Sequence, residues 1–364
     1  MNYAATALGS GTGEGHHSTI GDLAVEWLEN KEQYLKPSSF APLQTAWRVY
    51  VAPRWGKIKT GEVRPSEVEN WVRELALGHA PTARVRSKDG VPRSPSVVLR
   101  SVGILAGILD VAVRDGVVSV NAARGLSNLP RTGWRPRRPY LTHEQVFQFA
   151  AAAPDEMRAT LILTLAYTGI RWGEAIGLTV DDVDVITRKL RIRRTVTEVD
   201  GRLCVGAPKS WQARTVPFPA LLDAGITALV TTGGPGAPLF RSAAGGFLRR
   251  PDTAKGKYSW WLTALNHANL PHLTPHDLRH TAASLAVSAG ANVKVLQRVL
   301  GHRSAAMTLD VYAELFEEDL SSFASQLNDR AVEANGFVGS ALRGEGGAGL
   351  QRSIEPLESR SRPL

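Results

Sequence analysis

A stretch of turn-forming and basic residues divides this chain into two unequal parts. Residues 131–139 contain four arginines, two prolines and a glycine, and apolar residues do not recur there at a helical or strand period. Such a composition is typical of a loop, so we interpret the stretch as a linker between two domains. The chain has 364 residues, of which 43% are hydrophobic, and this is enough for two domains with cores of their own.

The first part, residues 19–130, is predicted to be a helical domain. Apolar residues recur at helical spacing in residues 23–28, 40–51, 65–75 and 97–113. Segment 97–113 is the most apolar of these, but Arg100 and Asp110 interrupt it, so we do not expect it to span a membrane. Residues 1–18 are rich in Gly, Ser, Thr and His and are predicted to be a disordered tail.

The second part, residues 140–331, is predicted to mix helices with a short sheet. Thr142 and Gln145 form a plausible capping box before helical segments 143–153 and 155–167. Leu190 and Ile192 then alternate with basic residues, which is the period of a strand, and residues 203–207 and 215–218 are further strand candidates. Helical patterns return from residue 258, and residues 332–364 are predicted to be a flexible tail. The expected fold is therefore mainly α with a small β-sheet, of the α+β class.

The net charge and the cysteine content indicate which kind of partner and which cell compartment suit this chain. Lys and Arg number 43 against 34 Asp and Glu, for a net charge of +9 and a pI near 9.8. This excess suits a polyanionic partner, although an incidentally basic protein has the same balance. Cys204 is the single cysteine, so an intrachain disulfide is excluded. Because the N-terminus also lacks a basic start followed by an apolar segment, we expect a reducing, cytoplasmic location.

Basic residues and a tyrosine stand in short, distinctive contexts along the second part. An arginine follows a Thr-Gly turn in residues 168–174, and a His-x-x-Arg pair in residues 273–281 shares one helix face. A Leu-Gly-His triplet and a tyrosine follow, and a lysine lies between two strand candidates. Positioned cations stabilise the charge that builds up when a phosphodiester is displaced, and a tyrosine can be the covalent nucleophile. The set is Arg171, Lys209, His276, Arg279, His302 and Tyr312.

A metal or nucleotide site has less support. His272, His276 and His280 fall four residues apart, but no cysteine or carboxylate completes a tetrahedral ligand set. The chain has no phosphate-binding loop of the Gly-x-x-x-x-Gly-Lys-Ser/Thr type and no acidic cluster for a two-metal nuclease. We therefore expect neither a metal nor another cofactor.

The order Arg, Lys, His-x-x-Arg, Gly-His, Tyr resembles the tyrosine recombinases, the family of phage integrases and site-specific recombinases. The resemblance implies a helical, SAM-like core DNA-binding domain and a catalytic domain that clamp DNA from opposite sides. It implies that Arg171 and Arg279 hold the scissile phosphate, with His302 as a further donor and His276 as a donor or a base. Lys209 would protonate the leaving 5′ oxygen from a hairpin turn, and Tyr312 would form a 3′-phosphotyrosine without ATP or Mg²⁺.

Glu174 lies one helical turn after Arg171 and is the expected accessory residue. It could orient Arg171 or a catalytic histidine by a hydrogen bond, or it could be an ordinary helix-surface glutamate. Basic residues of the 81–95 loop, the linker and the strand around Leu190 are expected to grip the DNA backbone. These are Arg84, Arg86, Lys88, Arg93, Arg135, Arg137, Arg138, Arg191 and Arg193.

The partner implied by the resemblance is double-stranded DNA at a specific, attachment-like site, for integration or excision of a phage or mobile element. Exchange between two duplexes needs four active sites, so we expect a homotetramer on DNA, in the cytoplasm and associated with the nucleoid. Accessory directionality or DNA-bending proteins are compatible with this role, and a membrane partner is not expected. Two alternatives remain: a type IB topoisomerase with similar chemistry, and a non-catalytic DNA-binding relic of an integrase.

Overall fold

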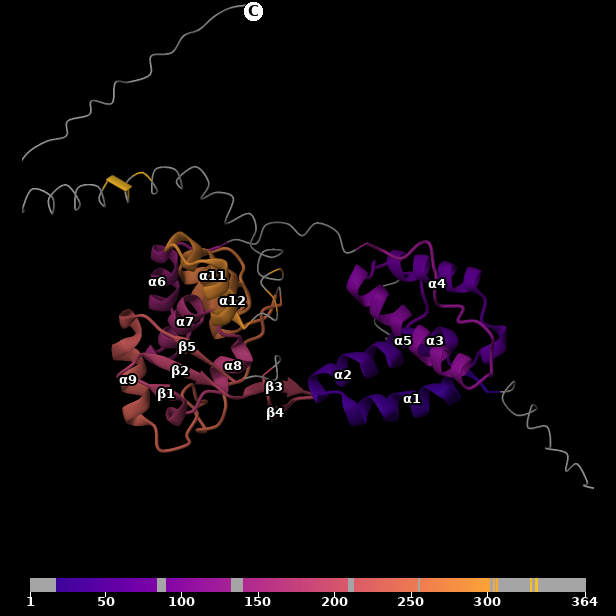
Figure 1. Ribbon diagram of the computed structural model, residues 1–364, viewed down its shortest axis with the longest axis horizontal. Helices are drawn as coiled ribbons and strands as arrows, with labels where there is room; N and C mark the ends of the chain where they lie inside the picture. The colour runs from indigo at the N-terminus through magenta and orange to yellow at the C-terminus, as the bar shows by residue number, and fades with distance from the viewer. Residues whose placement is uncertain are drawn as a thin grey trace, which may run out of the picture. The chain divides into compact units, whose positions relative to one another are not determined.

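The computed structural model describes residues 18–83, 90–131, 140–208, 213–254 and 256–301, with residues 304, 306, 328, 331 and 332 (Figure 1). Contacts divide the chain into two compact units, residues 1–281 and 282–364. Most of the predicted linker, residues 132–139, and nearly all of both predicted tails lie outside the described residues. The division at residues 131–139 therefore stays a prediction.

The described residues between 18 and 114 form helices, as predicted. Thr19 and Asp22 form a capping box before α1, and proline occupies the first turn of α2, α4 and α5, where a backbone N–H is not needed. A π-helical turn and a short helix follow α2. The bounds are α1 Ile20–Tyr34, α2 Pro37–Ala46, η2 Trp47–Val51, α3 Ala52–Trp55, η3 Thr60–Glu62, α4 Pro65–Leu77 and α5 Pro95–Arg114.

Helix α5 is the centre of this helical core. Its buried side chains, among them Val98, Val102, Leu105 and Leu109, pack with a cluster that includes the edge-to-face pair Trp55–Trp71. By length and composition α5 is the one helix among the described residues that could cross a membrane. Half of the apolar stretch of α5 is buried inside the protein, as is typical of a helix in the core of a folded domain.

The helices of residues 143–168 and 260–300 lie where the sequence predicts them, whereas those between residues 172 and 232 were not predicted. The Thr142–Gln145 capping box is confirmed at the start of α6, and Gly169 ends α7 with a left-handed φ of 63°. Gly301 ends α12 in the same way, with a φ of 65°. The bounds are α6 His143–Ala151, α7 Glu156–Thr168, α8 Trp172–Ile176, η4 Val180–Asp182, η5 Ala220–Leu222, α9 Asp223–Thr232, α10 Trp260–His267, α11 Asp277–Ser288 and α12 Val293–Leu300.

Two small antiparallel sheets replace the single sheet that the sequence predicted. Strands β1 (Val183–Asp184), β2 (Lys189–Ile192) and β5 (Arg214–Pro217) form one sheet in the order β1-β2-β5. Strands β3 (Thr195–Val199) and β4 (Arg202–Gly206) form a separate hairpin. In β2 the predicted alternation is confirmed, because Leu190 and Ile192 are buried and the basic residues beside them are exposed.

The place of Lys209 in a turn stays a prediction, but residues 203–207 and 215–218, which flank it, do not pair with each other as one hairpin. The first of these strands pairs with β3, and the second pairs with β2. The turn at Asp200-Gly201, where both residues have positive φ, closes the real hairpin and is a common hairpin turn sequence. Lys209 itself lies outside the described residues, in the segment that connects the two sheets.

Candidate active site

The site is built around the turn that separates α7 from α8. Gly169 ends α7, and Arg171 takes an extended conformation as the residue that caps α8. The backbone N–H of Arg171 donates to Glu174 Oε2 at 2.9 Å, and Arg171 Nη1 donates to Glu174 Oε1 at 3.0 Å. Glu174 thus holds both the backbone and the guanidinium of Arg171, as the first of its two sequence interpretations proposed.

Glu174 is almost completely buried, with 1% of its side chain exposed. Arg214, at the start of β5, donates to both carboxylate oxygens, from Nη1 to Oε1 at 3.0 Å and from Nη2 to Oε2 at 2.7 Å. Burial alone raises the pKa of the Glu174 carboxyl, but the two hydrogen-bonded arginines outweigh it and lower the pKa to about 2. The carboxylate is therefore ionised throughout the physiological range.

Arg279 reaches the same turn from α11. Asp277, the first residue of this helix, fastens the preceding turn by accepting hydrogen bonds from the backbone N–H and hydroxyl of Thr274, at 2.8 and 2.7 Å. Arg279 is 3% exposed and donates from Nη1 to the carbonyl oxygen of Gly169 at 2.7 Å. This hydrogen bond joins residues that are far apart in the sequence, and through it Arg279 holds the turn immediately before Arg171.

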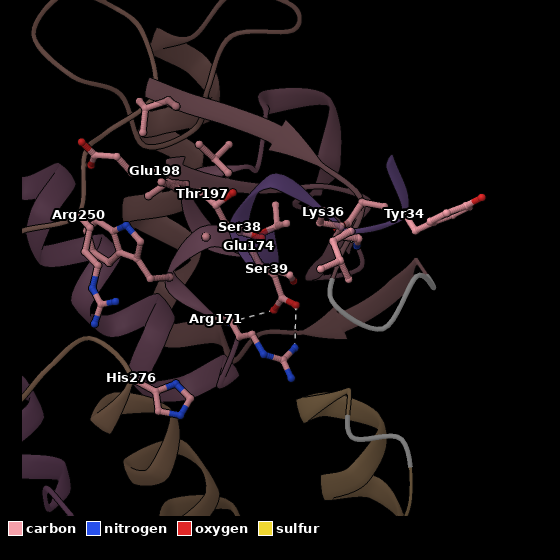
Figure 2. Close-up of a pocket in the computed structure, with 18 residues that line it drawn as sticks. Tyr34, Lys36, Ser38, Ser39, Arg171, Glu174, Thr197, Glu198, Arg250 and His276 are labelled. Carbon is pink, nitrogen blue, oxygen red and sulfur yellow. Dashed lines mark hydrogen bonds and ion pairs between the residues drawn. The ribbon is translucent and has the colours of Figure 1, made fainter. Parts of the chain in front are cut away.

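His276 is exposed at the entrance of α11 and lines a cavity of ≈ 840 Å³ together with Arg171 and Glu174 (Figure 2). The side chains of Arg171 and His276 meet the same space although they come from different elements. Residues from the end of α1 and the start of α2 and from the β3–β4 hairpin complete its wall. A cavity with cationic and imidazole groups on its wall suits an anionic substrate.

Metal ligation has no support among the described residues, where no group of three or more His, Cys, Asp or Glu side chains could hold an ion. His272 Nε2 lies 2.6 Å from the carbonyl oxygen of Thr253, and the rings of His276 and His280 stack edge to face with centroids 5.3 Å apart. The three histidines of the four-residue repeat therefore have different surroundings.

Comparison with known proteins decides the family. The Phage integrase family model matches residues 139–319. The tyrosine recombinase XerC of Mycobacterium leprae is 33% identical over 220 residues, which are 56% of this chain and 67% of that protein. The chain belongs to the tyrosine recombinase family. It is a DNA strand breaking-and-rejoining enzyme, a site-specific recombinase, and DNA is its partner.

Two further similarities extend beyond the catalytic part of this recombinase. A putative prophage phiRv2 integrase of Mycobacterium tuberculosis is 26% identical over 294 residues, covering 80% of this chain and 73% of that protein. The Tn1549 transposon integrase, solved in complex with a circular intermediate DNA, has a TM-score of 0.65 at 21% identity over 80% of this chain and 94% of that one. At this identity the structural match shows the fold alone, and it agrees with the expected α+β class.

Several predicted site residues of the recombinase lie outside the described residues. They are Lys209, His302 and Tyr312 of the catalytic set, and Arg84, Arg86, Lys88, Arg135, Arg137 and Arg138 of the DNA-contact set. Their roles stay predictions. Of the catalytic set, the structure brings Arg171 and His276 to one cavity and places Arg279 behind the turn that carries Arg171.

The described DNA-contact candidates have protein partners. Arg193 pairs with the buried Asp182 at 2.5 Å, and Arg191 lies 4.0 Å from Asp184. The guanidinium of Arg93 lies over the ring of Tyr50, 5.7 Å from its centroid. These contacts give each arginine a structural role, and their contact with DNA stays a prediction.

Arg214 is the residue of this site that sequence reasoning missed. In the sequence it stands directly before the strand candidate 215–218. Its partner is Glu174, which is 40 positions away in the chain. A signal was present, since Arg214 is at one end of a strand and Glu174 is an unmatched acid beside a cationic site.

Proposed function

We propose that Arg171, Arg279 and His276 form the cradle of the scissile phosphate. The observation that carries this proposal is that Arg171 and His276 line one cavity while Arg279 is hydrogen bonded to the turn immediately before Arg171. Guanidinium groups match phosphate oxygens with paired N–H donors, and donors that are already in place stabilise the developing charge without reorganisation.

The reaction proposed for this cradle is a transesterification. The phenol of Tyr312 gives its proton to a base, for which His276 is the candidate, and its oxygen attacks phosphorus. A tyrosine O–P bond forms, and the bond from phosphorus to the 5′ oxygen breaks. Lys209 gives a proton to the leaving 5′ oxygen, and His302 adds a further donor to the phosphate. Because the 3′-phosphotyrosine keeps an ester bond, a 5′ hydroxyl from another strand reverses the step without ATP or metal.

The proposed substrate is an attachment-like site in double-stranded DNA, used to integrate or excise a phage or mobile element. The similarity to a prophage integrase supports this use. Two duplexes exchange four strands, which calls for four active sites, so we propose a homotetramer assembled on DNA, with room for directionality or bending proteins. The location proposed is the cytoplasm, on the nucleoid.

A suicide substrate tests the proposal. It is nicked close to the cleavage site, so that the short fragment with the free 5′ hydroxyl diffuses away after cleavage. Wild-type protein is expected to accumulate a covalent protein–DNA complex. Tyr312→Phe is expected to bind the same DNA in a gel shift without forming that complex. A covalent complex at the wild-type level in Tyr312→Phe would show that another residue is the nucleophile.

The same preparation separates the two alternative functions. A type IB topoisomerase relaxes any supercoiled plasmid, whereas a site-specific recombinase needs its own site. A non-catalytic relic binds DNA but leaves no covalent complex on any substrate.

A further inference from the structure

Each carboxylate oxygen of Glu174 accepts two hydrogen bonds. Oε1 accepts from Nη1 of Arg171 and Nη1 of Arg214, both at 3.0 Å. Oε2 accepts from the backbone N–H of Arg171 at 2.9 Å and from Nη2 of Arg214 at 2.7 Å. Rotation of the carboxylate would break several of these bonds, so its orientation is fixed by four donors.

Arg214 supplies the half of this arrangement that does not come from Arg171. Its side chain is 11% exposed and meets Glu174 as a bidentate fork, the geometry that best fixes a carboxylate plane. The side chain of Arg171 is 27% exposed and belongs to the cavity wall. Arg214 therefore determines where Glu174 points, and Glu174 determines where the Arg171 guanidinium lies.

The net charge of the cluster of Arg171, Glu174 and Arg214 also indicates a role for Arg214 at the cavity. Arg171 and Glu174 alone would form a neutral pair with little attraction for a phosphate. Arg214 adds a second positive charge behind the carboxylate, so that the cluster of three keeps a net positive charge next to the cavity. This difference in charge favours the binding of an anion at the cavity.

We propose that Arg214 is a positioning residue for DNA cleavage, which orients Glu174 and offsets its charge so that Arg171 presents a fixed cation to the scissile phosphate. This inference rests on the proposed function, in which Arg171 binds that phosphate. The competing view is that Arg214 only fastens β5 to α8, as an ordinary buried ion pair.

The test compares two substrates that differ in one charge. One suicide substrate carries a normal scissile phosphate, and the other carries a methylphosphonate, which is uncharged at that position. If the cluster acts by binding the charge of the phosphate, disrupting it should slow cleavage of the neutral substrate much less. A merely structural ion pair matters equally on both.

The variants are Arg214→Ala and Arg214→Lys, with Arg188→Ala as the matched control. Arg188 lies in the turn between β1 and β2 and makes a comparable but exposed fork to Asp223 at the start of α9, from Nε at 2.9 Å and Nη2 at 2.7 Å. Each variant is measured by single-turnover formation of the covalent complex, by DNA affinity and by thermal melting.

Misplacing a group that orients the reacting centre typically costs about 10²-fold in rate, so Arg214→Ala should slow cleavage of the phosphate substrate by about that factor. Most of this loss should disappear on the methylphosphonate, while Arg188→Ala should match wild type on both. Arg214→Lys should fall between, because a lysine restores the charge but not the fork. Where Arg214→Ala does not melt cooperatively, Arg214→Lys decides the question by the same two rates.

Wild-type cleavage by both Arg214 variants, or an equal loss on the two substrates, would overturn the inference. Arg171→Ala on the same substrates keeps this outcome separate from the proposed function. If Arg171→Ala cleaves the phosphate normally, the phosphate cradle itself is wrong. If Arg171→Ala is impaired and recovers on the methylphosphonate but the Arg214 variants do not recover, only the role of Arg214 fails.

Discussion

Replacing Glu174 by glutamine should lower the free energy of unfolding of the catalytic residues 140–331, by an amount that depends on pH. The folded carboxyl has a pKa of about 2, against an ordinary value of 4.5, and its side chain is 1% exposed. Each pKa unit corresponds to about 1.4 kcal/mol, so the ionised Glu174 contributes about 3 kcal/mol at pH 7. Removing one partner of a buried ion pair costs about the same, 3–5 kcal/mol, because the remaining charges lose their compensation.

The pH dependence has a defined direction. Because the pKa of Glu174 is lower in the folded state, the unfolded chain takes up the proton first as the pH falls. The stabilisation is complete above about pH 5 and is lost as the pH falls from about 4.5 toward 2. In Glu174→Gln this contribution is absent at every pH, so the difference from wild type should be largest at pH 7 and should narrow toward pH 3.

Urea unfolding of both proteins at several pH values between 7 and 3 measures this difference. Asp223→Asn is the control, because Asp223 pairs with Arg188 on the exposed surface, where ion pairs contribute little. Parallel stability curves for wild type and Glu174→Gln across the whole range would refute the reasoning, since they would mean that Glu174 is not ionised against its arginines.

Three further results are expected. Arg171→Lys should lower the single-turnover cleavage rate by about 10²–10³, because a point charge does not replace a bidentate donor, and a near-normal rate would make Arg171 a surface residue. Lys209→Ala should lose about 10²–10⁴ in rate on normal DNA and recover with a bridging 5′-phosphorothiolate, whose sulfur leaves without a proton; equal defects on both substrates would mean that Lys209 only holds DNA. Gly173→Ala should destabilise the fold by about 1–3 kcal/mol, because its new Cβ would lie 2.6 Å from both Thr195 Oγ1 and the carbonyl oxygen of Val196; an unchanged urea midpoint would contradict this.

The helices were predictable because their signals are local. Capping residues, first-turn prolines and terminal glycines act within one turn, and Thr142, Pro65 and Gly301 mark ends that the structure confirms. Strand pairing depends on partners far along the chain. Residues 203–207 were recognised as a strand, but their partner is β3, which was overlooked, so the pairing was predicted wrongly.

The candidate site shows the same limit. The motif around Arg171 and the His-x-x-Arg pair could be recognised because each is a short run of residues. That Arg279 would bind the carbonyl of Gly169 could not be read from either motif, because it depends on how α11 packs against the end of α7. Arg214 was missed for the same reason, since a single arginine at a strand end has no meaning until its carboxylate partner is placed.

The two arginines of the proposed cradle are held by different means, and this has a consequence for the charge of the site. Arg279 is buried, and it donates a hydrogen bond to the carbonyl oxygen of Gly169, which helps to fix its position. Arg171 is bound by a full negative charge, which would cancel it if Arg214 were not on the other side of Glu174. The recombinase can fix both arginines in place before DNA arrives and still offer the phosphate a positively charged surface, which is the condition for stabilising a charge that appears only in the transition state.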